Sequence, residues 1–253
     1  MTGLEIAVLL GVGLVGGVWN AIAGGATLFT FPALMFVGLP PLVANATNYL
    51  GLLPSNAAAL LAYGPQLRRL SAQLIPLVLI SGFGATLGAV LLLFSDPAAF
   101  MVLVPFLILT ATLLFALGEP LRRLLSRLAG QSNATLVAFS FLFLSSIYGG
   151  YFGAGLGIIL LAIAQVMGHS DFHDANCIKN LLATSFTLIS IAIFGIGGLI
   201  DWSAAGLMVL GSSLGGYAGG RWAKNLNQNL LRTAVIGFGL ILSVTHFWRV
   251  FSA

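Results

Sequence analysis

One lysine of this chain stands where a charged side chain is costly and therefore informative. Lys179 lies at the head of a long apolar segment, in the run NCIKNLL of residues 176–182. An ionisable residue inside a membrane segment usually serves function. An ammonium group there, flanked by the amides of Asn176 and Asn180, would attract and hold a small anion. A lysine near a helix start can also extend its charge to the membrane interface, and the sequence leaves that alternative open.

A second polar group opens the corresponding apolar segment in the first half of the chain. It consists of Asn45, Thr47 and Asn48, and Asn48 occupies the place that Lys179 has in the second half. An amide in lipid is costly unless it is hydrogen-bonded. These side chains would donate to the same anion, or they would cap a helix and bond to a neighbouring helix. In the first case the site is asymmetric, with its charge on one side.

A short glycine-containing break precedes each polar group. Residues 23–25 read AGG and residues 153–155 read GAG. Irregular backbone at membrane depth survives only where it is buried in protein or lines a wet cavity. A short helix that begins at such a break presents free N–H groups and partial positive charge, which favour an anion; the glycines could instead permit only a bend or close packing. The expected site includes Gly24, Gly25, Ala26, Thr27, Ala154 and Gly155, with Asn20 and Tyr151 as weaker candidates.

These features recur at an offset of about 130 residues, half the chain. Broken hydrophobic segments at matching positions of two halves are typical of the central site of a transporter. We expect a first repeat over residues 1–118, a basic amphipathic linker over residues 119–132 and a second repeat over residues 133–253. Each repeat would contain one broken or re-entrant glycine-rich helix and three membrane spans.

The composition is that of a membrane protein with helical spans. Hydrophobic residues make up 59% of the 253 residues and charged residues 6%, and the mean hydropathy is +1.06. A soluble domain carries roughly 25% charged residues, so this chain cannot cover itself with a polar surface. The expected fold class is therefore all-α and polytopic, with the lipid bilayer as a partner. Spans are expected at residues 43–62, 72–95, 97–117, 175–197, 203–220 and 231–251, and interrupted stretches at residues 4–22 with 26–37 and 134–152 with 155–167.

The basic residues flank the apolar segments, so the net charge of +4 needs no nucleic-acid partner. They cluster at Arg68 and Arg69, in the linker and over residues 221–232, whereas Asp96 and Asp201 stand in the intervening turns. Cytoplasmic loops of membrane proteins carry an excess of Lys and Arg, which places the basic segments in the cytoplasm. Three clear spans then follow each interrupted stretch. We expect inverted repeats, which requires that each interrupted stretch is re-entrant or otherwise adds an even number of crossings; the repeats would be parallel if each stretch crossed once.

A metal site is the main competing chemistry. Residues 169–174 read HSDFHD, and His and carboxylate side chains are common metal ligands. The spacing matches no strong motif, so we interpret the run as a solvated loop or helix cap and expect no metal, no cofactor and no enzymatic activity. No carboxylate falls in the middle of a span, where a proton-driven carrier usually needs one. An inside-negative potential favours anion exit by about 2.3 kcal/mol per charge per 100 mV, so an exporter needs no coupled ion.

A set of motifs occurs in the same order in both halves. The first half contains Gly16-Gly17, Ala23-Gly24-Gly25, Pro32, Gly38 and ANATN at residues 44–48; the second contains YGGYFGAGLG at residues 148–157, Gly168 and residues 176–182. This set resembles the TauE/SafE family of sulfite exporters, also called the toluene-sulfonate uptake permease family, over nearly the whole chain. The resemblance implies a multi-pass carrier of the bacterial inner membrane, with two related halves, that moves sulfite, sulfoacetate or related anions, usually outward.

We therefore expect an alternating-access exporter of a small sulfur-containing oxyanion, sulfite before organosulfonates. A proton- or sodium-coupled importer of sulfonate- or sulfate-type anions is the alternative, and a membrane metalloenzyme is a weaker one. Glycines spaced four apart, such as Gly13 and Gly17, form smooth strips that allow helices to pack closely. If these strips face outward, they would also support a homodimer.

Overall fold

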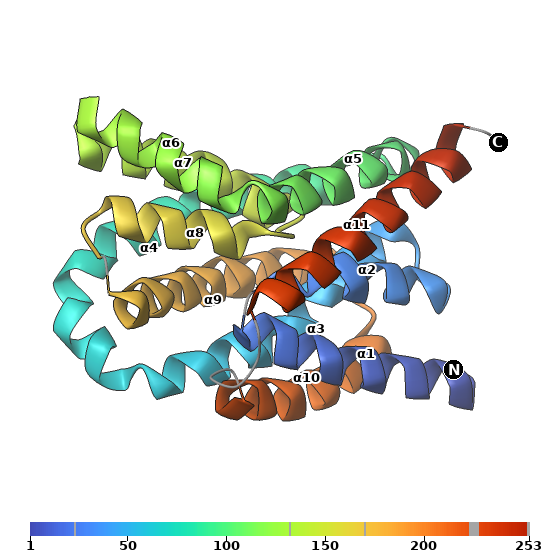
Figure 1. Cartoon of the computed structure of the whole chain (residues 1–253). Helices are drawn as coiled ribbons and strands as arrows, with labels where there is room; N and C mark the ends of the chain where they lie inside the picture. Colours follow the sequence, from blue (N-terminus) through green and yellow to red (C-terminus); the bar gives the residue numbers. More distant parts are fainter. Residues whose placement is uncertain (23, 132, 170, 223–227, 252–253) are drawn as a thin grey trace.

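The computed structural model describes residues 1–22, 24–131, 133–169, 171–222 and 228–251. Eleven α-helices and no strands occur in these residues, which confirms the all-α fold class (Figure 1). The helices are α1 (Gly3–Ile22), α2 (Thr27–Phe36), α3 (Pro41–Ala62), α4 (Gly64–Leu93), α5 (Pro97–Ala116), α6 (Gly118–Gln131), α7 (Ala134–Tyr151), α8 (Leu156–Val166), α9 (Phe172–Ile196), α10 (Trp202–Trp222) and α11 (Gln228–Phe251).

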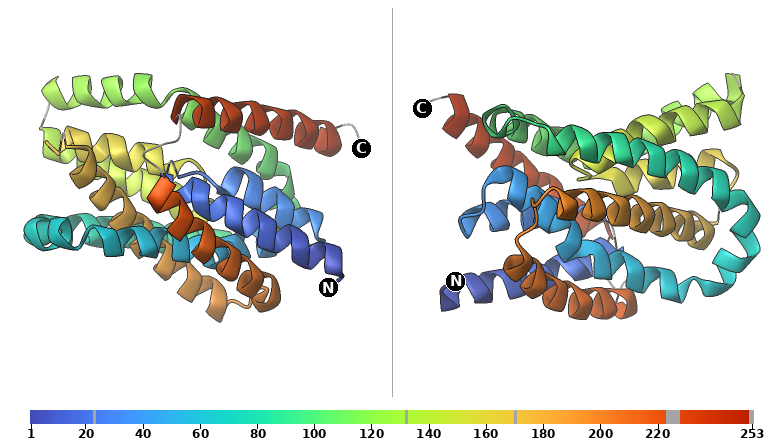
Figure 2. Two further views of the ribbon diagram at one scale, coloured as in Figure 1. Left: turned by 60° about the horizontal axis from the view of Figure 1, so that its bottom comes forward. Right: turned by 180° about the vertical axis from the view of Figure 1, so that it is seen from behind.

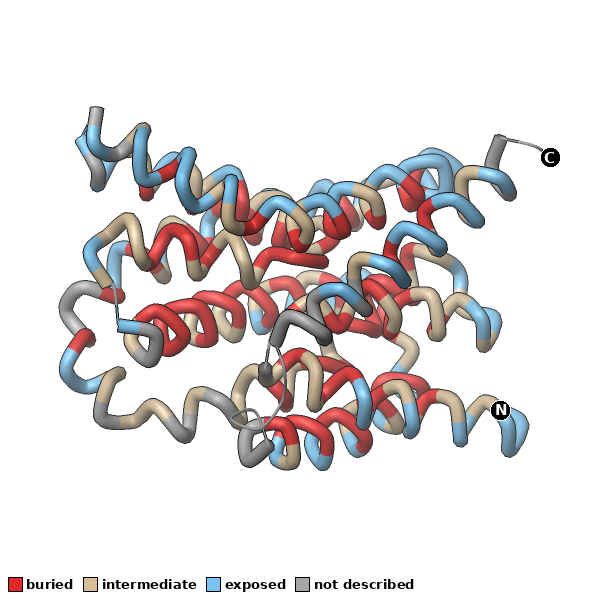
Figure 3. The backbone as a smooth tube through the Cα atoms, in the orientation of Figure 1, coloured by how far each residue is buried: buried red, intermediate tan, exposed pale blue. Residues whose placement is uncertain are grey.

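Among the described residues, four helices are long and apolar enough to cross a membrane. They cover Gly3–Ala21, Leu74–Leu93, Pro97–Ala116 and Asp174–Ile196. Large apolar side chains such as Phe83, Leu91 and Trp248 are exposed on the outside of the molecule, whereas buried residues gather toward its middle (Figure 3). An exposed apolar surface of this extent suits contact with lipid rather than water. The chain is therefore a multi-pass membrane protein.

Both expected breaks occur, between α1 and α2 and between α7 and α8. The backbone turns there through glycines with φ values of +82° at Gly25 and +76° at Gly155. Side chains disfavour this left-handed region, so glycine ends one helix and lets the next begin in a new direction. Gly25 is also confined, because a Cβ at this position would overlap the ring of Phe115. The local sequence therefore sets the position of each break.

The first helix of each interrupted stretch packs along a helix from the other half of the chain. α1 packs along α10, and α7 packs along α4. Small residues bring these axes together: a Cβ at Gly13 would lie 2.8 Å from the carbonyl oxygen of Met208, and a Cβ at Gly84 would lie 2.7 Å from that of Phe143. The glycine strips considered for a homodimer are thus used inside one chain.

The chain runs in opposite directions through the two interrupted stretches. In Figure 1, α1 runs from the right toward the centre and α2 returns to the right; α7 runs from the left toward the centre and α8 returns to the left. α3 and α9 pack against each other between these two hairpins. The start of α1 and the end of α11 lie on the same side of the molecule in all views (Figure 2).

Candidate functional site

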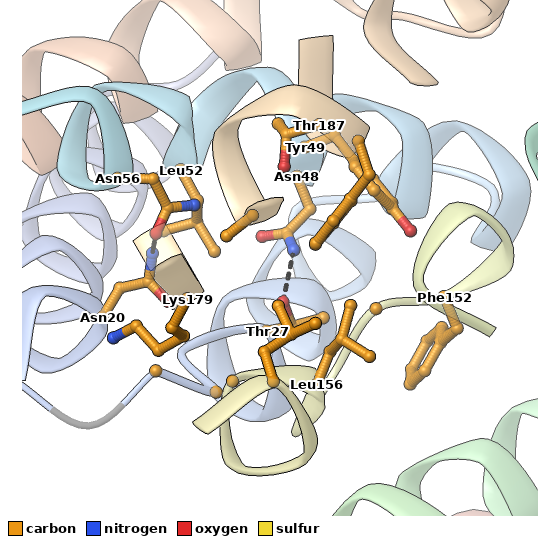
Figure 4. A pocket seen from close by; sticks show the side chains of 17 residues that line it. Asn20, Thr27, Asn48, Tyr49, Leu52, Asn56, Phe152, Leu156, Lys179 and Thr187 are labelled. Carbon is orange, nitrogen blue, oxygen red and sulfur yellow. Dashed lines mark hydrogen bonds between the residues drawn. The ribbon is translucent and has the colours of Figure 1, made fainter. Parts of the chain in front are cut away.

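A cavity of about 60 Å³ lies where the two broken segments meet α3 and α9 (Figure 4). The breaks approach each other closely there, since a Cβ at Gly24 would lie only 3.7 Å from the Cα of Gly157. Both hairpin tips and both central helices therefore contribute to one site. Its lining consists of Asn20, Gly24, Gly25, Thr27, Asn48, Tyr49, Leu52, Asn56, Phe152, Gly153, Leu156, Gly157, Leu160, Lys179, Ala183, Phe186 and Thr187.

α3 and α9 each turn one face toward the cavity. Lining residues recur every four positions, at Asn48, Leu52 and Asn56 on α3. Lys179 begins the same pattern on α9, and residues 183 and 187 continue it. Side chains four apart lie on one face of an α-helix. On each helix, these lining residues thus form a single stripe, which begins at Asn48 on α3 and at Lys179 on α9.

Lys179 supplies the charge of the cavity. Its side chain is 3% exposed and lies on the cavity wall, so the ammonium group does not extend to the outer surface. Within the described part of the chain, it has no hydrogen bond and no salt bridge. No acidic side chain is among the residues that line the cavity. A buried ammonium group without a counter-charge is costly, and a bound anion would compensate it.

The amide of Asn20 orients a neighbouring donor toward the site. Its Nδ2 donates to the hydroxyl of Ser55 at 2.8 Å and to Oδ1 of Asn56 at 2.9 Å. Because Oδ1 of Asn56 accepts this bond, its Nδ2 group remains free to donate. Figure 4 shows Asn20, Asn56 and Lys179 on the same side of the cavity.

Asn48 is oriented by two hydroxyl groups of α2. Oδ1 of Asn48 accepts from Thr30 at 2.5 Å, and Nδ2 donates to Thr27 at 3.1 Å (Figure 4). One N–H of Asn48 and the hydroxyl proton of Thr27 remain available to a ligand. Thr187, across on α9, adds a hydroxyl group that has no partner among the described residues. The polar lining is therefore rich in donors.

Two helices begin at the cavity. Thr27 starts α2 and Leu156 starts α8, and neither helix has a side-chain hydrogen bond at its N-cap. The backbone N–H groups of Gly25 and Ala26 have no acceptor within the described residues. A helix N-terminus carries partial positive charge, so both helices favour an anion at this place.

Six of the predicted site residues line this cavity: Asn20, Gly24, Gly25, Thr27, Asn48 and Lys179. The structure turns several others toward neighbouring elements. Asn45 donates to the carbonyl oxygen of Tyr151 at 2.9 Å, and Asn176 donates to the hydroxyl of Tyr63 at 2.8 Å. Thr47 accepts from the backbone N–H of Asp201 at 3.0 Å. These three bonds hold helices of different halves together.

The remaining predicted residues also lie off the cavity wall. Ala26 and Gly155 are the N-caps of α2 and α8. The carbonyl oxygen of Ala154 accepts from the hydroxyl of Tyr148 at 2.9 Å, whereas the side chain of Tyr151 contacts Ser95. Asn180 is completely buried, and neither atom of its amide has a partner among the described residues.

Sequence reasoning did not single out Tyr49, Asn56 or Thr187. Asn56 and Thr187 could have been found by extending the four-residue spacing from Asn48 and Lys179. Tyr49 lies outside this spacing, and its hydroxyl donates to the carbonyl oxygen of Gly149 on another helix.

The described acidic residues at the start of α9 form an ion pair and a helix cap. Arg69 of α4 contacts both carboxylate oxygens of Asp174, and Asp171 accepts from the backbone N–H of Asp174 at 3.1 Å. Ser170 and the side chain of His173 lie outside the described residues. The structure thus shows a helix cap and a link between α4 and α9 at this place.

Comparison with known proteins gives a consistent family. The family model described as "Sulfite exporter TauE/SafE" matches residues 9–245. A "Probable membrane transporter protein" of Haemophilus influenzae is 35% identical over 239 residues, covering 91% of this chain and 90% of the relative. The "Probable membrane transporter protein YfcA" of Escherichia coli K12 is 28% identical, covering 95% and 88%. The "Probable membrane transporter protein ORF9" of a Sinorhizobium species is 25% identical, covering 94% and 91%. No solved structure matches.

Proposed function

Because the chain belongs to the TauE/SafE family of sulfite exporters, we propose that it exports a small sulfur-containing oxyanion, with sulfite as the first candidate. Transport would occur by alternating access at the central cavity. The observation that carries this proposal is the ammonium group of Lys179, which has no partner among the described residues and lies among donors on a cavity wall without a carboxylate. This arrangement selects for negative charge before any other property of the ligand.

The size of the cavity favours a small anion. A water needs roughly 10–15 Å³ of such volume, so the cavity of about 60 Å³ accommodates about four to six water-sized groups. Sulfite has four non-hydrogen atoms, whereas an organosulfonate adds a carbon substituent. The apolar residues Leu52, Phe152 and Phe186 on the same wall would have to move to admit the larger ion.

Outward movement follows from the charges. An inside-negative potential drives an anion out by about 2.3 kcal/mol per charge per 100 mV. The cavity wall has no acidic side chain that could carry a coupled proton. Export down this potential needs no such group, whereas import against it would require a coupled ion.

The chain would be organised as inverted repeats in the bacterial inner membrane, with residues 1–118 and 133–253 as the two repeats and residues 119–132 as the linker. Two observations support this organisation. The hairpins of α1 with α2 and of α7 with α8 enter from opposite sides of the molecule (Figure 1), and each returns to the side from which it came. The pairing of α1 with α10 also corresponds to that of α7 with α4. The basic segments would face the cytoplasm.

Flux through purified protein in liposomes tests the transport proposal. We expect sulfite to move with an imposed potential and to carry net charge, and sulfate, thiosulfate and a sulfonate to move more slowly. Lys179→Ala should abolish most of this flux, and Arg68→Gln, which removes an exposed charge, should not. Wild-type flux in Lys179→Ala would overturn the site. Uptake that collapses with a proton or sodium ionophore would establish the importer instead.

Cysteine labelling tests the inverted repeats. Cys177 is the only cysteine and is buried, so Cys177→Ala gives a background without thiols. Val37 and Met167 are the C-cap residues of α2 and α8, at matching positions of the two halves. With inverted repeats, an impermeant maleimide applied to intact cells labels Val37→Cys and spares Met167→Cys. Labelling of both from the same side would mean that the repeats are parallel.

A further inference from the structure

A second cavity lies outside the transport site, in the angle between α5 and α6. Its volume is about 340 Å³. Leu113, Leu117 and Leu124, which border it, are 44%, 51% and 51% exposed, so the cavity is an open groove on the surface of the molecule. Its lining consists of Thr110, Leu113, Leu114, Leu117, Pro120, Leu121 and Leu124, of which all but Thr110 are apolar.

The groove exists because the chain bends between two helices. α5 ends at Ala116, Leu117 leaves the helical conformation with φ of −103°, and α6 starts at Gly118. α6 packs against α7 and α8, and Leu125 is buried on its inner side. Leu121 and Leu124 point away from that contact, toward the groove. One apolar face of α6 is therefore left without a protein partner in the described part of the chain.

The same face of α6 leads to positive charge. Arg127 follows Leu124 by three positions and so borders the leucines of the groove, and Arg123 lies four positions before Arg127, beside it on the adjoining face of α6. Both side chains are exposed. Arg127 has no hydrogen bond or salt bridge within the described residues. A free guanidinium group beside an apolar groove matches a ligand that joins a phosphate to a hydrocarbon chain.

Glu119 offsets only part of this charge. Its carboxylate accepts from Arg122 at 2.6 and 2.9 Å and from Arg123 at 3.2 Å. The hydrogen bond from Arg122, and then that from Arg123, lower the pKa of Glu119 to about 2, so the carboxylate stays ionised. With three arginines against one glutamate, α6 keeps a net charge of plus two.

The groove runs from the depth of the central cavity toward one face of the membrane. At its α5 end, a Cβ at Gly155 would lie 3.5 Å from the Cβ of Leu114, so this end lies beside the second helix break. From there α6 continues toward the side on which α7 begins and α8 ends (Figure 1), so its arginines lie closer than the α5 leucines to the lipid phosphates beyond the hydrocarbon core. We propose that this groove is a binding site for one anionic phospholipid, with an acyl chain along the leucines and the headgroup phosphate on Arg127 and Arg123. Basic pockets beside membrane helices bind anionic headgroups in this way.

Native mass spectrometry of the purified full-length protein tests this proposal. The protein is mixed with equal amounts of phosphatidylglycerol and phosphatidylcholine, and the retained lipid is identified. We expect phosphatidylglycerol to be retained in preference. A surface arginine changes the affinity for an anionic lipid by about five-fold, so Arg127→Gln should weaken retention about five-fold and Arg123→Gln with Arg127→Gln should weaken it further. Arg68→Gln, an exposed arginine away from the groove, is the matched control.

A second variant tests the groove itself. Leu121→Trp fills the groove while leaving every charge in place, and it should lower retention of the lipid without changing the folded yield. Equal retention of both lipids, or an equal loss in Arg68→Gln and Arg127→Gln, would overturn the site. A dimer that is disrupted by Leu121→Trp would show that a second copy of this chain, and not a lipid, occupies the groove.

Discussion

The two central helices, α3 and α9, differ in whether the polar side chains that face the cavity are hydrogen-bonded to other residues. On the α3 side, Asn48 is held by Thr27 and Thr30, and Asn56 is held by Asn20. On the α9 side, Lys179 and Thr187 have no partner among the described residues. The α3 side is thus a fixed set of donors, whereas the α9 side carries the positive charge of the cavity. If the two halves are repeats, as proposed above, the matching positions Asn48 and Lys179 account for the difference in charge between the two sides of the cavity.

Lys179→Met removes the charge of the α9 side and should have the largest effect on anion flux. Loss of a buried charged partner costs 2–5 kcal/mol, so we expect anion flux at low concentration to fall by about 100-fold. The same variant should melt at a higher temperature in the absence of anion, because methionine removes an unpaired buried charge. Flux and melting temperature that fall together would indicate a structural role for Lys179 instead.

Damage to a hairpin tip should come next. Gly24 and Gly25 both have positive φ, but only a Cβ at Gly25 would overlap Phe115. Strain at such a backbone position costs about 1–3 kcal/mol and overpacking adds about 1–3 kcal/mol. Gly25→Ala should therefore destabilise the protein by about 2 kcal/mol more than Gly24→Ala. Thermal unfolding in detergent measures the difference, and equal melting temperatures would show that the ring of Phe115 moves aside.

Moving the charge across the cavity sharpens the comparison. In Asn48→Lys with Lys179→Asn, the total charge is kept but the charge lies on the α3 side. We expect the double variant to transport about ten-fold faster than Lys179→Asn, a difference of about 1.4 kcal/mol, and more slowly than wild type, because a displaced charge in the cavity still attracts the anion. Concentration-dependent flux measures this effect. If the double variant is as slow as Lys179→Asn alone, the position of the charge matters more than its presence.

The ion pair between Arg69 and Asp174 should have the smallest effect. It fixes the start of α9 to α4, but Arg69 is largely exposed. Exposed pairs typically contribute 0.2–1 kcal/mol. A double-mutant cycle with Arg69→Gln and Asp174→Asn should therefore give a coupling of less than about 1 kcal/mol in thermal unfolding. A much larger coupling would mean that this link, and not the packing of α3 on α9, positions Lys179.

The helix breaks could be located from the sequence because glycine acts locally. The expected stretches at residues 4–22 and 26–37 correspond to α1 and α2 within a residue or two. Local chemistry also identified Asn48 and Lys179, since one polar residue in an apolar run is conspicuous. Their role in binding an anion stays a prediction.

The direction of each amide could not be predicted in the same way. Thr47 and Asn180 are next to Asn48 and Lys179 in sequence, but one position along a helix turns a side chain by 100°. That rotation brings Thr47 to the backbone of Asp201. Whether Asn45 meets the cavity or the carbonyl oxygen of Tyr151 depends on where α7 lies, and only the assembled fold determines that.

The pairing of α1 with α10 also constrains how the protein is made. α1 leaves the ribosome about 200 residues before α10, since α1 begins at Gly3 and α10 at Trp202. At roughly 5–20 residues per second, α1 waits on the order of ten to forty seconds for the helix that covers its glycine strip. During that interval the glycine face of α1 lacks its helical partner, so the insertion machinery, or lipid itself, must cover it until α10 is inserted.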